Sequence, residues 1–293
     1  MITTESRVVD LYREPVQEVL IVKTLLPIFF CVILLSAGSL AIADTVADLT
    51  EVYTDAGAPG LEYPAPTGIH GIIGAGLFNG ERIIGDTRRR TVLLPIVLMT
   101  YQDRAYWSIG GGGLWLFQSD DHALKLGIGV KVHPGYRPDD NSDLAGMEPR
   151  STSLDGFVNS LWKAPVINVG LRFYHDIGQV SQGDSITLRL SHNFIINPEF
   201  RLTPSLGVDW LNAKYVDYYY GVRQAEALPG RPAYTGRATV NVGVGVAGAY
   251  RVSRSWSFLG GLYSTHLGGG IEDSPIVTNR SSTLVYFGAG WIF

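Results

Sequence analysis

Apolar residues occupy every second position along much of this chain, from about residue 68 to its end. In the stretch ALKLGIGVKVH, aliphatic side chains alternate with small or charged residues, which are Lys125, Gly127, Gly129, Lys131 and His133. A period of two residues is typical of a β-strand, because successive side chains point to opposite faces of a sheet. The pattern therefore predicts an all-β protein.

Twelve strands are predicted from this alternation, which places both ends of the sheet-forming region on the same side. The expected segments are 68–79, 90–101, 105–118, 123–133, 153–162, 165–176, 184–193, 200–211, 213–222, 237–249, 254–266 and 282–293. The glycines at 110–113 are interpreted as small residues inside one strand. This count places the long loop 134–152 at the end with the short turns. Merging 200–222 into one strand would move that loop to the other end but leaves eleven strands. Because both termini then require an even number, another strand in the first half must also be wrong, and ten strands are the alternative.

The two faces of these strands favour a membrane barrel over a soluble sandwich. One face is continuously apolar, while the other mixes Gly with Lys, Arg, Asn and Ser. This is the apolar-out, polar-in alternation of an outer-membrane barrel. Strands of about ten residues are long enough to cross a membrane when tilted, and aromatic residues near their ends resemble interfacial girdles. Because lipid offers no hydrogen bonds, we expect a closed transmembrane antiparallel β-barrel over 68–293.

The segment before the barrel divides into two parts. An apolar stretch follows Lys23 and ends in Ala41-Ile42-Ala43, which is a small-x-small cleavage signal. Residues 1–43 are therefore expected to form a cleaved signal peptide, with a long acidic start that suggests a misplaced first codon. Residues 44–67 are expected to form a periplasmic extension. The sole cysteine, Cys31, lies in the leader, so the processed chain has no disulfide to stabilise it.

Composition limits the possible partners. Only 17% of residues are charged, against about 25% in soluble domains, while Gly accounts for 35 of 293 residues. The net charge of −4 gives no basic surface for nucleic acid. The composition thus agrees with a protein embedded in lipid, located in the outer membrane of a Gram-negative cell.

Several segments, taken together, resemble the MipA/OmpV family of outer-membrane proteins, whose name comes from the MltA-interacting protein. They are GYRPDDNSDLAGM at 135–147, HDIGQVSQGDS at 175–185, KYVDYYYGV at 214–222, LPGRPAYTG at 228–236, AYRVSRSWSF at 249–258, DSPIV at 273–277 and the terminal YFGAGWIF. The resemblance runs from about residue 123 to the end and is weaker over 44–122. The segment at 214–222 is the most specific of the set.

This resemblance implies a non-enzymatic outer-membrane scaffold. The family's namesake bridges a lytic transglycosylase and a murein synthase, so peptidoglycan-remodelling enzymes are the implied partners. A narrow channel for small solutes and an adhesin are the alternatives, because other family members are described in those terms. In the adhesin interpretation, loops 223–236 and 267–281 would contact host matrix.

The predicted lumen carries charges that bear on a channel. Lys125, Lys131, Arg172 and Arg189 lie on the inward parity of their strands, with Asp209 as a candidate partner. Unpaired, the four cations would select anionic solutes. Paired with Asp209 or similar groups, they would narrow the lumen, since buried charges rarely stand alone.

Catalysis and cofactor binding find little support. No serine, histidine and carboxylate can be assigned to one triad from the sequence, and no two histidines have metal-ligand spacing. Acidic residues at 120–121 and 139–143 could hold a divalent cation, or form solvated loops. Arginines at 88–90 could attract lipopolysaccharide phosphates. We therefore expect no cofactor.

The chain ends in a strand rather than in a polar tail. Phe287, Trp291 and Phe293 share one parity of the segment STLVYFGAGWIF, while Gly288 and Gly290 occupy the other. A terminal aromatic residue after alternating apolar positions resembles the signal read by the outer-membrane assembly machinery. These three residues are accordingly predicted to serve as the assembly signal and to face lipid.

Overall fold

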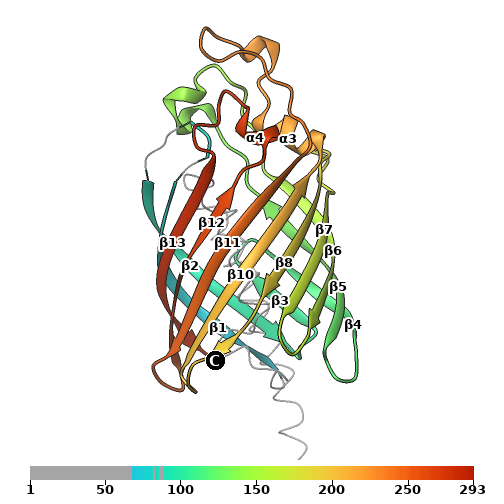
Figure 1. Ribbon diagram of the computed structural model, residues 1–293, viewed down its shortest axis with the longest axis vertical. Helices are drawn as coiled ribbons and strands as arrows, with labels where there is room; N and C mark the ends of the chain where they lie inside the picture. Colours follow the sequence, from blue (N-terminus) through green and yellow to red (C-terminus); the bar gives the residue numbers. More distant parts are fainter. Residues whose placement is uncertain (1–67, 82, 86–88) are drawn as a thin grey trace, which may run out of the picture. The chain divides into compact units, whose positions relative to one another are not determined.

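The computed structural model describes residues 68–81, 83–85 and 89–293, and these form one closed antiparallel sheet (Figure 1). Its strands are β1 (Ile69–Glu81), β2 (Arg89–Tyr101), β3 (Ala105–Ser108), β4 (Gly111–Gln118), β5 (Leu124–His133), β6 (Ser153–Lys163), β7 (Asn168–Asp176), β8 (Asp184–Ser191), β9 (Phe194–Ile195), β10 (Phe200–Leu211), β11 (Thr239–Arg251), β12 (Trp256–His266) and β13 (Ser281–Ile292). The predicted signal peptide and the extension at 44–67 lie outside the described residues.

Closure depends on the pairing of the first strand with the last. β1 pairs with β13 from Ile72 opposite Ile292 to Gly80 opposite Leu284, and β10 pairs with β11. The two-residue β9 continues the edge of β8 along β10, so twelve strands make up the ring. The predicted transmembrane β-barrel of twelve strands is confirmed, and the alternative of ten is wrong.

The predicted strand 105–118 is wrong, because it is a tight hairpin of two strands. β3 pairs back onto β4 from Ala105 opposite Leu114 to Ser108 opposite Gly111. Gly110 has a φ of 120°, which a residue with a side chain rarely adopts. The glycines at 110–113 therefore include a turn residue, and only the last three belong to a strand.

The predicted strand 213–222 is also wrong, because it contains the helix α3 (Ala213–Tyr220). The side chain of Asn212 caps the helix by accepting a hydrogen bond from the backbone of Tyr215. Val216 and Tyr219 are buried three positions apart, which suits one helix face. One error adds a strand and the other removes one, so the number of strands stays at twelve. The direction of the strands between them is reversed, and loop 134–152 therefore lies at the end that carries the other long loops.

The two ends of the barrel differ. The chain terminus and the short connections 102–104, 119–123, 164–167 and 252–255 lie at one end, whereas the long loops 134–152, 212–238 and 267–280 lie at the other. Figure 1 shows α3 and α4 (Gly269–Glu272) at the end opposite the C-terminus. Short turns face the periplasm and long loops face outward in outer-membrane barrels, so the long loops are extracellular.

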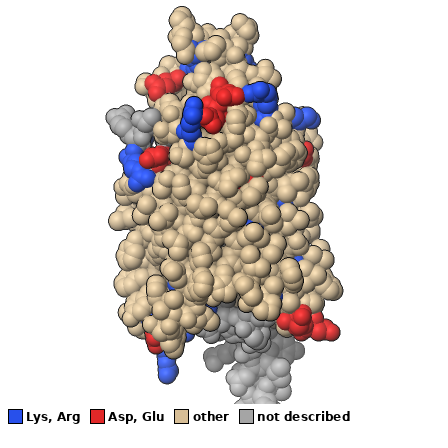
Figure 2. Space-filling model, in the orientation of Figure 1, with Lys and Arg blue, Asp and Glu red and all other residues tan. Residues whose placement is uncertain are grey.

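The outer surface is an apolar band. Exposed large apolar residues on it include Leu77, Leu93, Leu126, Ile128, Val158, Leu171, Val242, Val244, Leu262, Val285 and Phe287. Figure 2 shows one face of the molecule, with charged side chains gathered towards its two ends and a middle band nearly free of them. Within the described residues, no helix is long and apolar enough to cross a membrane.

Candidate functional site: lumen and outer cap

Three of the cationic residues predicted for the lumen, Lys125, Lys131 and Arg189, lie beside carboxylate or aromatic side chains. Lys125, which is 3% exposed, reaches Oδ1 of Asp103 at 2.6 Å and lies 5.7 Å from the ring centre of Trp115. Asp103 belongs to the β2–β3 turn, so this ion pair lies near the periplasmic mouth. Lys131 lies 5.3 Å from the ring centre of Tyr174.

The second ion pair joins Arg189 on β8 to Asp209 on β10. Nη1 of Arg189 lies 3.0 Å from Oδ1 of Asp209, which also accepts a hydrogen bond from Thr187 at 2.8 Å. The guanidinium lies 5.8 Å from the ring centre of Tyr263 on β12. Arg172 is 3% exposed on β7. Burial of the Lys125 and Arg189 charges is tolerated because a carboxylate lies beside each of them. Solute selection by these residues stays a prediction.

Glycines on β10 and β11 make room for these side chains. A Cβ atom added at Gly207 would collide with the guanidinium of Arg189 and the phenol of Tyr263, and one at Gly243 would collide with the same phenol. The side chains therefore lie flat against the barrel wall where the wall carries no side chain of its own. The alternation of Gly and Val in β11 is thus explained by what lies inside the barrel.

The opposite part of the lumen is apolar, which sequence reasoning missed. Buried inward residues come from β1, β2 and β11 to β13; they are Ile72, Phe78, Leu94, Ile96, Leu98, Ala247, Ala249, Leu259, Tyr263, Leu284 and Tyr286. Phe78 and Tyr286 stack with ring centres 5.7 Å apart. The run VLLPIVLM in β2 was the available signal, since a strand that is apolar on both parities contacts apolar groups on both faces.

The long outer loops fold into a cap with its own core. Leu144, Met147, Val222 and Ile276 are buried together, with Tyr136 and Tyr234 against them. These residues come from the four segments 135–147, 214–222, 228–236 and 273–277. The sequence segments most typical of the family therefore meet in one hydrophobic cluster at the extracellular end. We refer to loops 134–152, 212–238 and 267–280 as the outer cap.

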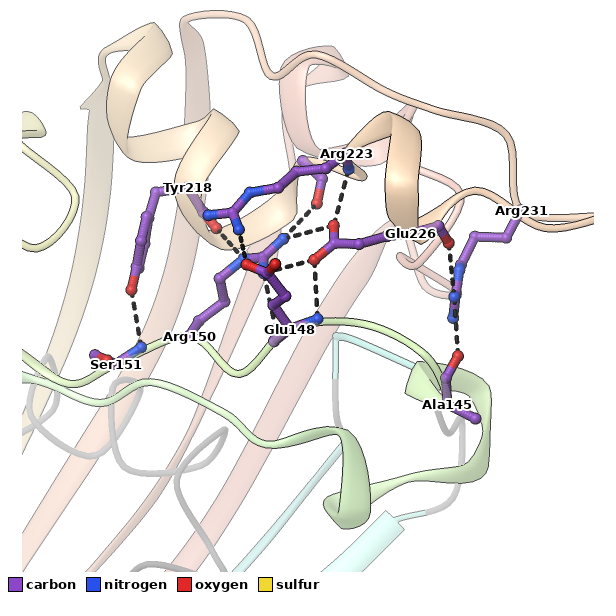
Figure 3. Close-up of polar contacts among 9 residues, drawn as sticks. Ala145, Glu148, Arg150, Ser151, Tyr218, Arg223, Glu226 and Arg231 are labelled. Atoms are coloured by element: carbon purple, nitrogen blue, oxygen red, sulfur yellow. Dashed lines mark hydrogen bonds and ion pairs between the residues drawn. The ribbon is translucent and has the colours of Figure 1, made fainter.

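A buried ion pair joins two loops of the outer cap (Figure 3). Both amino groups of Arg150 lie 2.9 Å from the two carboxylate oxygens of Glu226, and the two side chains are 1% and 2% exposed. Arg150 Nε also donates to the carbonyl of Tyr218 at 2.7 Å. Glu226 accepts further hydrogen bonds from the backbone N–H groups of Glu148 and Arg223.

Ionisation in the outer cap follows from this packing. Burial would raise the pKa of Glu226, but hydrogen bonds from Arg150 and the Arg223 backbone outweigh it, so the pKa lies below its ordinary value. Burial raises the pKa of the nearby Tyr136 to about 12. The pair is therefore charged, and Tyr136 is neutral, at neutral pH.

The residues of the predicted assembly signal lie on the final strand. Phe287 and Trp291 are 59% and 47% exposed on the outer face, and the ring of Phe293 stacks on Trp291 with centres 5.3 Å apart. The backbone of Phe293 pairs with Gly71 in both directions, at 3.1 and 3.2 Å. Their role in assembly stays a prediction.

Metal and lipopolysaccharide sites find no further support. The described part of the chain holds no group of three His, Cys, Asp or Glu side chains placed for a metal. Arg89 pairs with Glu81 at 2.9 Å and donates to the carbonyl of Thr283. It is thus engaged within the barrel wall, and attraction to lipid phosphates stays a prediction.

Comparison with known proteins decides the family. The family model of the MltA-interacting protein MipA matches residues 73–293, which includes every strand after the first few residues of β1. The chain belongs to this family. Its relatives include the MltA-interacting protein of Escherichia coli, which is 24% identical over 208 residues, covering 69% of this chain and 83% of the relative.

Two other relatives are outer membrane protein Omp26La of Vibrio anguillarum and OmpV of Vibrio cholerae. Each is 27% identical over 150 residues, covering 51% of this chain and 58% of the relative. This chain thus spans little more than half the length of those two relatives. Their names and the fold place this MipA-family protein in the outer membrane of Gram-negative cells, and none of these relatives' names denotes an enzyme.

Two solved outer-membrane proteins align with this chain at low similarity. The NanC porin aligns with a TM-score of 0.42 and 13% identity, covering 74% of this chain and 98% of the porin. An outer membrane channel from Pseudomonas putida F1 aligns with a TM-score of 0.43 and 14% identity, covering 78% and 96%.

Proposed function

We propose that this MipA-family barrel is a non-enzymatic scaffold that holds a murein-remodelling enzyme at the periplasmic face of the outer membrane. The observation that carries the proposal is family membership over 73–293, together with the name of the E. coli relative as an MltA-interacting protein. A lytic transglycosylase is accordingly the first partner to test, and a murein synthase the second.

The geometry of the outer end favours a scaffold over an open pore. The outer cap is a folded structure with a hydrophobic cluster and a buried ion pair, rather than a set of extended loops around a mouth. Two predicted lumen cations, Lys125 and Arg189, are engaged with carboxylates. Cations held in this way are poor sites for passing anions, because a solute must compete with a fixed counter-charge.

The periplasmic turns offer a surface for docking. Val166 in turn 164–167 is 76% exposed, and Ile195 in β9 and the following Ile196 are 67% and 58% exposed. The two segments are neighbours, because Asn168 at the start of β7 pairs with Ser191 at the end of β8. Exposed apolar residues grouped on a rim are typical of protein contacts.

A binding measurement with the barrel in lipid nanodiscs tests this proposal. The probe is a purified lytic transglycosylase, and the variant is Val166→Asp combined with Ile195→Asp. We expect binding to weaken by about tenfold or more, which corresponds to about 1.4 kcal/mol. Leu228→Asp is the matched control, because Leu228 is 52% exposed on the outer cap, at the opposite end; it should leave binding unchanged.

Two results would contradict the scaffold. The first is the absence of binding by the unaltered barrel to either class of murein enzyme. The second is stable ion-selective conductance in planar bilayers that Lys131→Glu or Arg172→Glu alters, because this would favour the channel. If binding survives the rim variants but is lost on deleting 44–67, the scaffold holds and its docking surface is the extension.

A further inference from the structure

The lumen of this barrel is wider than the inward side chains of its wall can fill. Eight strands enclose an interior that side chains just fill, and the diameter grows with the number of strands. This wall has twelve strands. With strands about 4.8 Å apart and tilted by about 40°, a ring of that size measures roughly 24 Å between opposite backbones. The middle of the lumen therefore has room for a further segment of chain.

Many inward positions add little volume to the lumen, yet the larger side chains beside them are buried. The inward parity of β1, β11 and β13 includes the small residues Gly74, Gly76, Gly80, Gly243, Gly245, Ala247, Ala249, Gly288 and Gly290. On β1 and β13, Ile72 and Leu284 are 0% and 1% exposed, and Arg172, on the opposite side of the ring, is 3% exposed. The long loops and short turns of the described chain lie at the two ends of the barrel. These side chains thus need a covering layer that the described strands do not supply.

The segment 44–67 joins the barrel at the mouth of this lumen. The carbonyl of Gly68 accepts a hydrogen bond of 3.1 Å from the backbone N–H of Gln102, in the periplasmic β2–β3 turn. Gly68 has a φ of 93°, so the chain changes direction just before β1 begins. Extended at about 3.3 Å per residue, the segment spans roughly 80 Å, more than twice the membrane hydrocarbon thickness of about 30 Å. It is therefore long enough to cross the lumen from this point.

The charge of the segment is opposite to that of the lumen cations. The segment contains no Lys or Arg, and its acidic residues are Asp44, Asp48, Glu51, Asp55 and Glu62. In the lumen, Arg172 at mid-height of β7 has the neutral cross-strand neighbours Asn159 and Thr187. The buried carboxylates Asp155 and Asp176 lie at the extracellular ends of β6 and β7. Since a buried charge is favoured by a counter-charge, an acidic segment suits the middle of this lumen.

We propose that residues 44–67 enter the lumen from the periplasmic mouth and form an internal plug, instead of extending into the periplasm. Its carboxylates face the side of the lumen that carries Arg172 and Lys131. Its apolar side chains cover the opposite side, where β1, β2 and β11 to β13 supply aliphatic residues; they are Val46, Leu49, Val52, Tyr53, Leu61 and Tyr63. The plug closes the barrel to solutes along its length.

The rate of thiol labelling tests the plug in lipid nanodiscs, where both ends of the barrel are accessible. In a Cys31→Ser background, Ala56→Cys places a thiol in the middle of the segment. Ser253→Cys is the reference, because Ser253 is exposed in the periplasmic turn 252–255. The reagent is a maleimide attached to a polyethylene glycol chain too bulky to enter the barrel. In urea, where the chain is unfolded, the two thiols should react at the same rate.

We expect labelling at position 56 to be at least about tenfold slower than at 253, because the plug must leave the lumen before it reacts. Arg172→Glu should accelerate labelling at 56 by about threefold or more, since it places a like charge against the acidic segment. Arg237→Glu is the control: Arg237 is 67% exposed on the outer cap, and the rate should not change. Heat-modifiable gel mobility shows whether each barrel has formed.

A second variant leaves the barrel wall untouched. Glu51→Lys combined with Asp55→Lys reverses two charges within the segment and should accelerate labelling at 56 as Arg172→Glu does. Labelling at 56 as fast as at 253 in the unaltered sequence would overturn the plug. Slow labelling that neither charge variant accelerates would also overturn it, because the segment would then be covered outside the cationic lumen. The measurement needs no murein enzyme, so its outcome is independent of the proposed scaffold.

Discussion

Replacing Arg150 with alanine should loosen the outer cap without unfolding the barrel. Arg150 donates to both carboxylate oxygens of Glu226 at 2.9 Å and to the carbonyls of Tyr218, Glu148 and Gly221 at 2.7, 2.8 and 3.3 Å. The substitution removes all of these donors and leaves the Glu226 carboxylate buried. The strands are unaffected, because none of these residues belongs to one.

The size of this loss of cap stability follows from the burial of the ion pair. Removing one partner of a buried ion pair costs about 3–5 kcal/mol, because the remaining charge has lost its compensation. Each 1.4 kcal/mol is a factor of about ten, so local opening of the outer cap should become roughly two to four orders of magnitude more frequent. Arg223→Ala is the control, since the ion pair of Arg223 with Glu148 has side chains 52% and 64% exposed. Exposed pairs contribute about 0–1 kcal/mol.

Amide hydrogen exchange in lipid nanodiscs measures this local opening. Exchange should accelerate at 134–152 and 212–238 in Arg150→Ala, while the strands keep their protection. Arg150→Met combined with Glu226→Leu should recover most of the lost protection in the outer cap, because replacing both charged side chains removes the cost of burying a charge without its partner. Unchanged exchange in Arg150→Ala would refute the argument that the ion pair holds the two loops together.

Three further predictions concern the cap, the lumen and the last strand. Because the pKa of Glu226 is lowered on folding, its contribution to stability is present above its ordinary value of 4.5 and is lost as pH falls through the lower folded value. Protection of the outer-cap amides, measured as exchange relative to the intrinsic rate at each pH, should therefore decrease below pH 4.5 in the unaltered protein and not in Glu226→Gln. Gly243→Val should lower barrel stability by about 1–3 kcal/mol by displacing Tyr263, measured as the urea midpoint; Gly248→Val on the same strand is the control, since an added Cβ there meets only ordinary contacts. Deleting Phe293 should reduce assembly more than partner binding, and normal heat-modifiable mobility with normal surface levels would contradict this.

The barrel could be predicted from sequence because its physical cause is local and repeated. Period-two alternation between lipid and lumen appears in each strand, and closure follows from the lack of hydrogen bonds in lipid. The inward parity of Lys125 and Arg189 could be assigned in the same way. Their partners could be predicted only in part. The sequence indicates Asp209 as a partner, whereas Asp103 lies in a turn that the predicted strand pattern does not connect with β5.

The tertiary structure decided what alternation does not encode. The residues KYVDYYY satisfy a strand pattern as well as a helix pattern, and the choice follows from the Asn212 cap and from the burial of Val216 and Tyr219 in the outer cap. The hairpin at Gly110 depends on a positive φ that a glycine permits but does not require. The meeting of four loop segments around Val222 depends on contacts between parts of the chain that are distant in sequence. Sequence alone thus determined the class of protein and its membrane, because each strand carries that information itself. The cap and the charge pairs arise only between separate strands and loops, so only the folded barrel decides them.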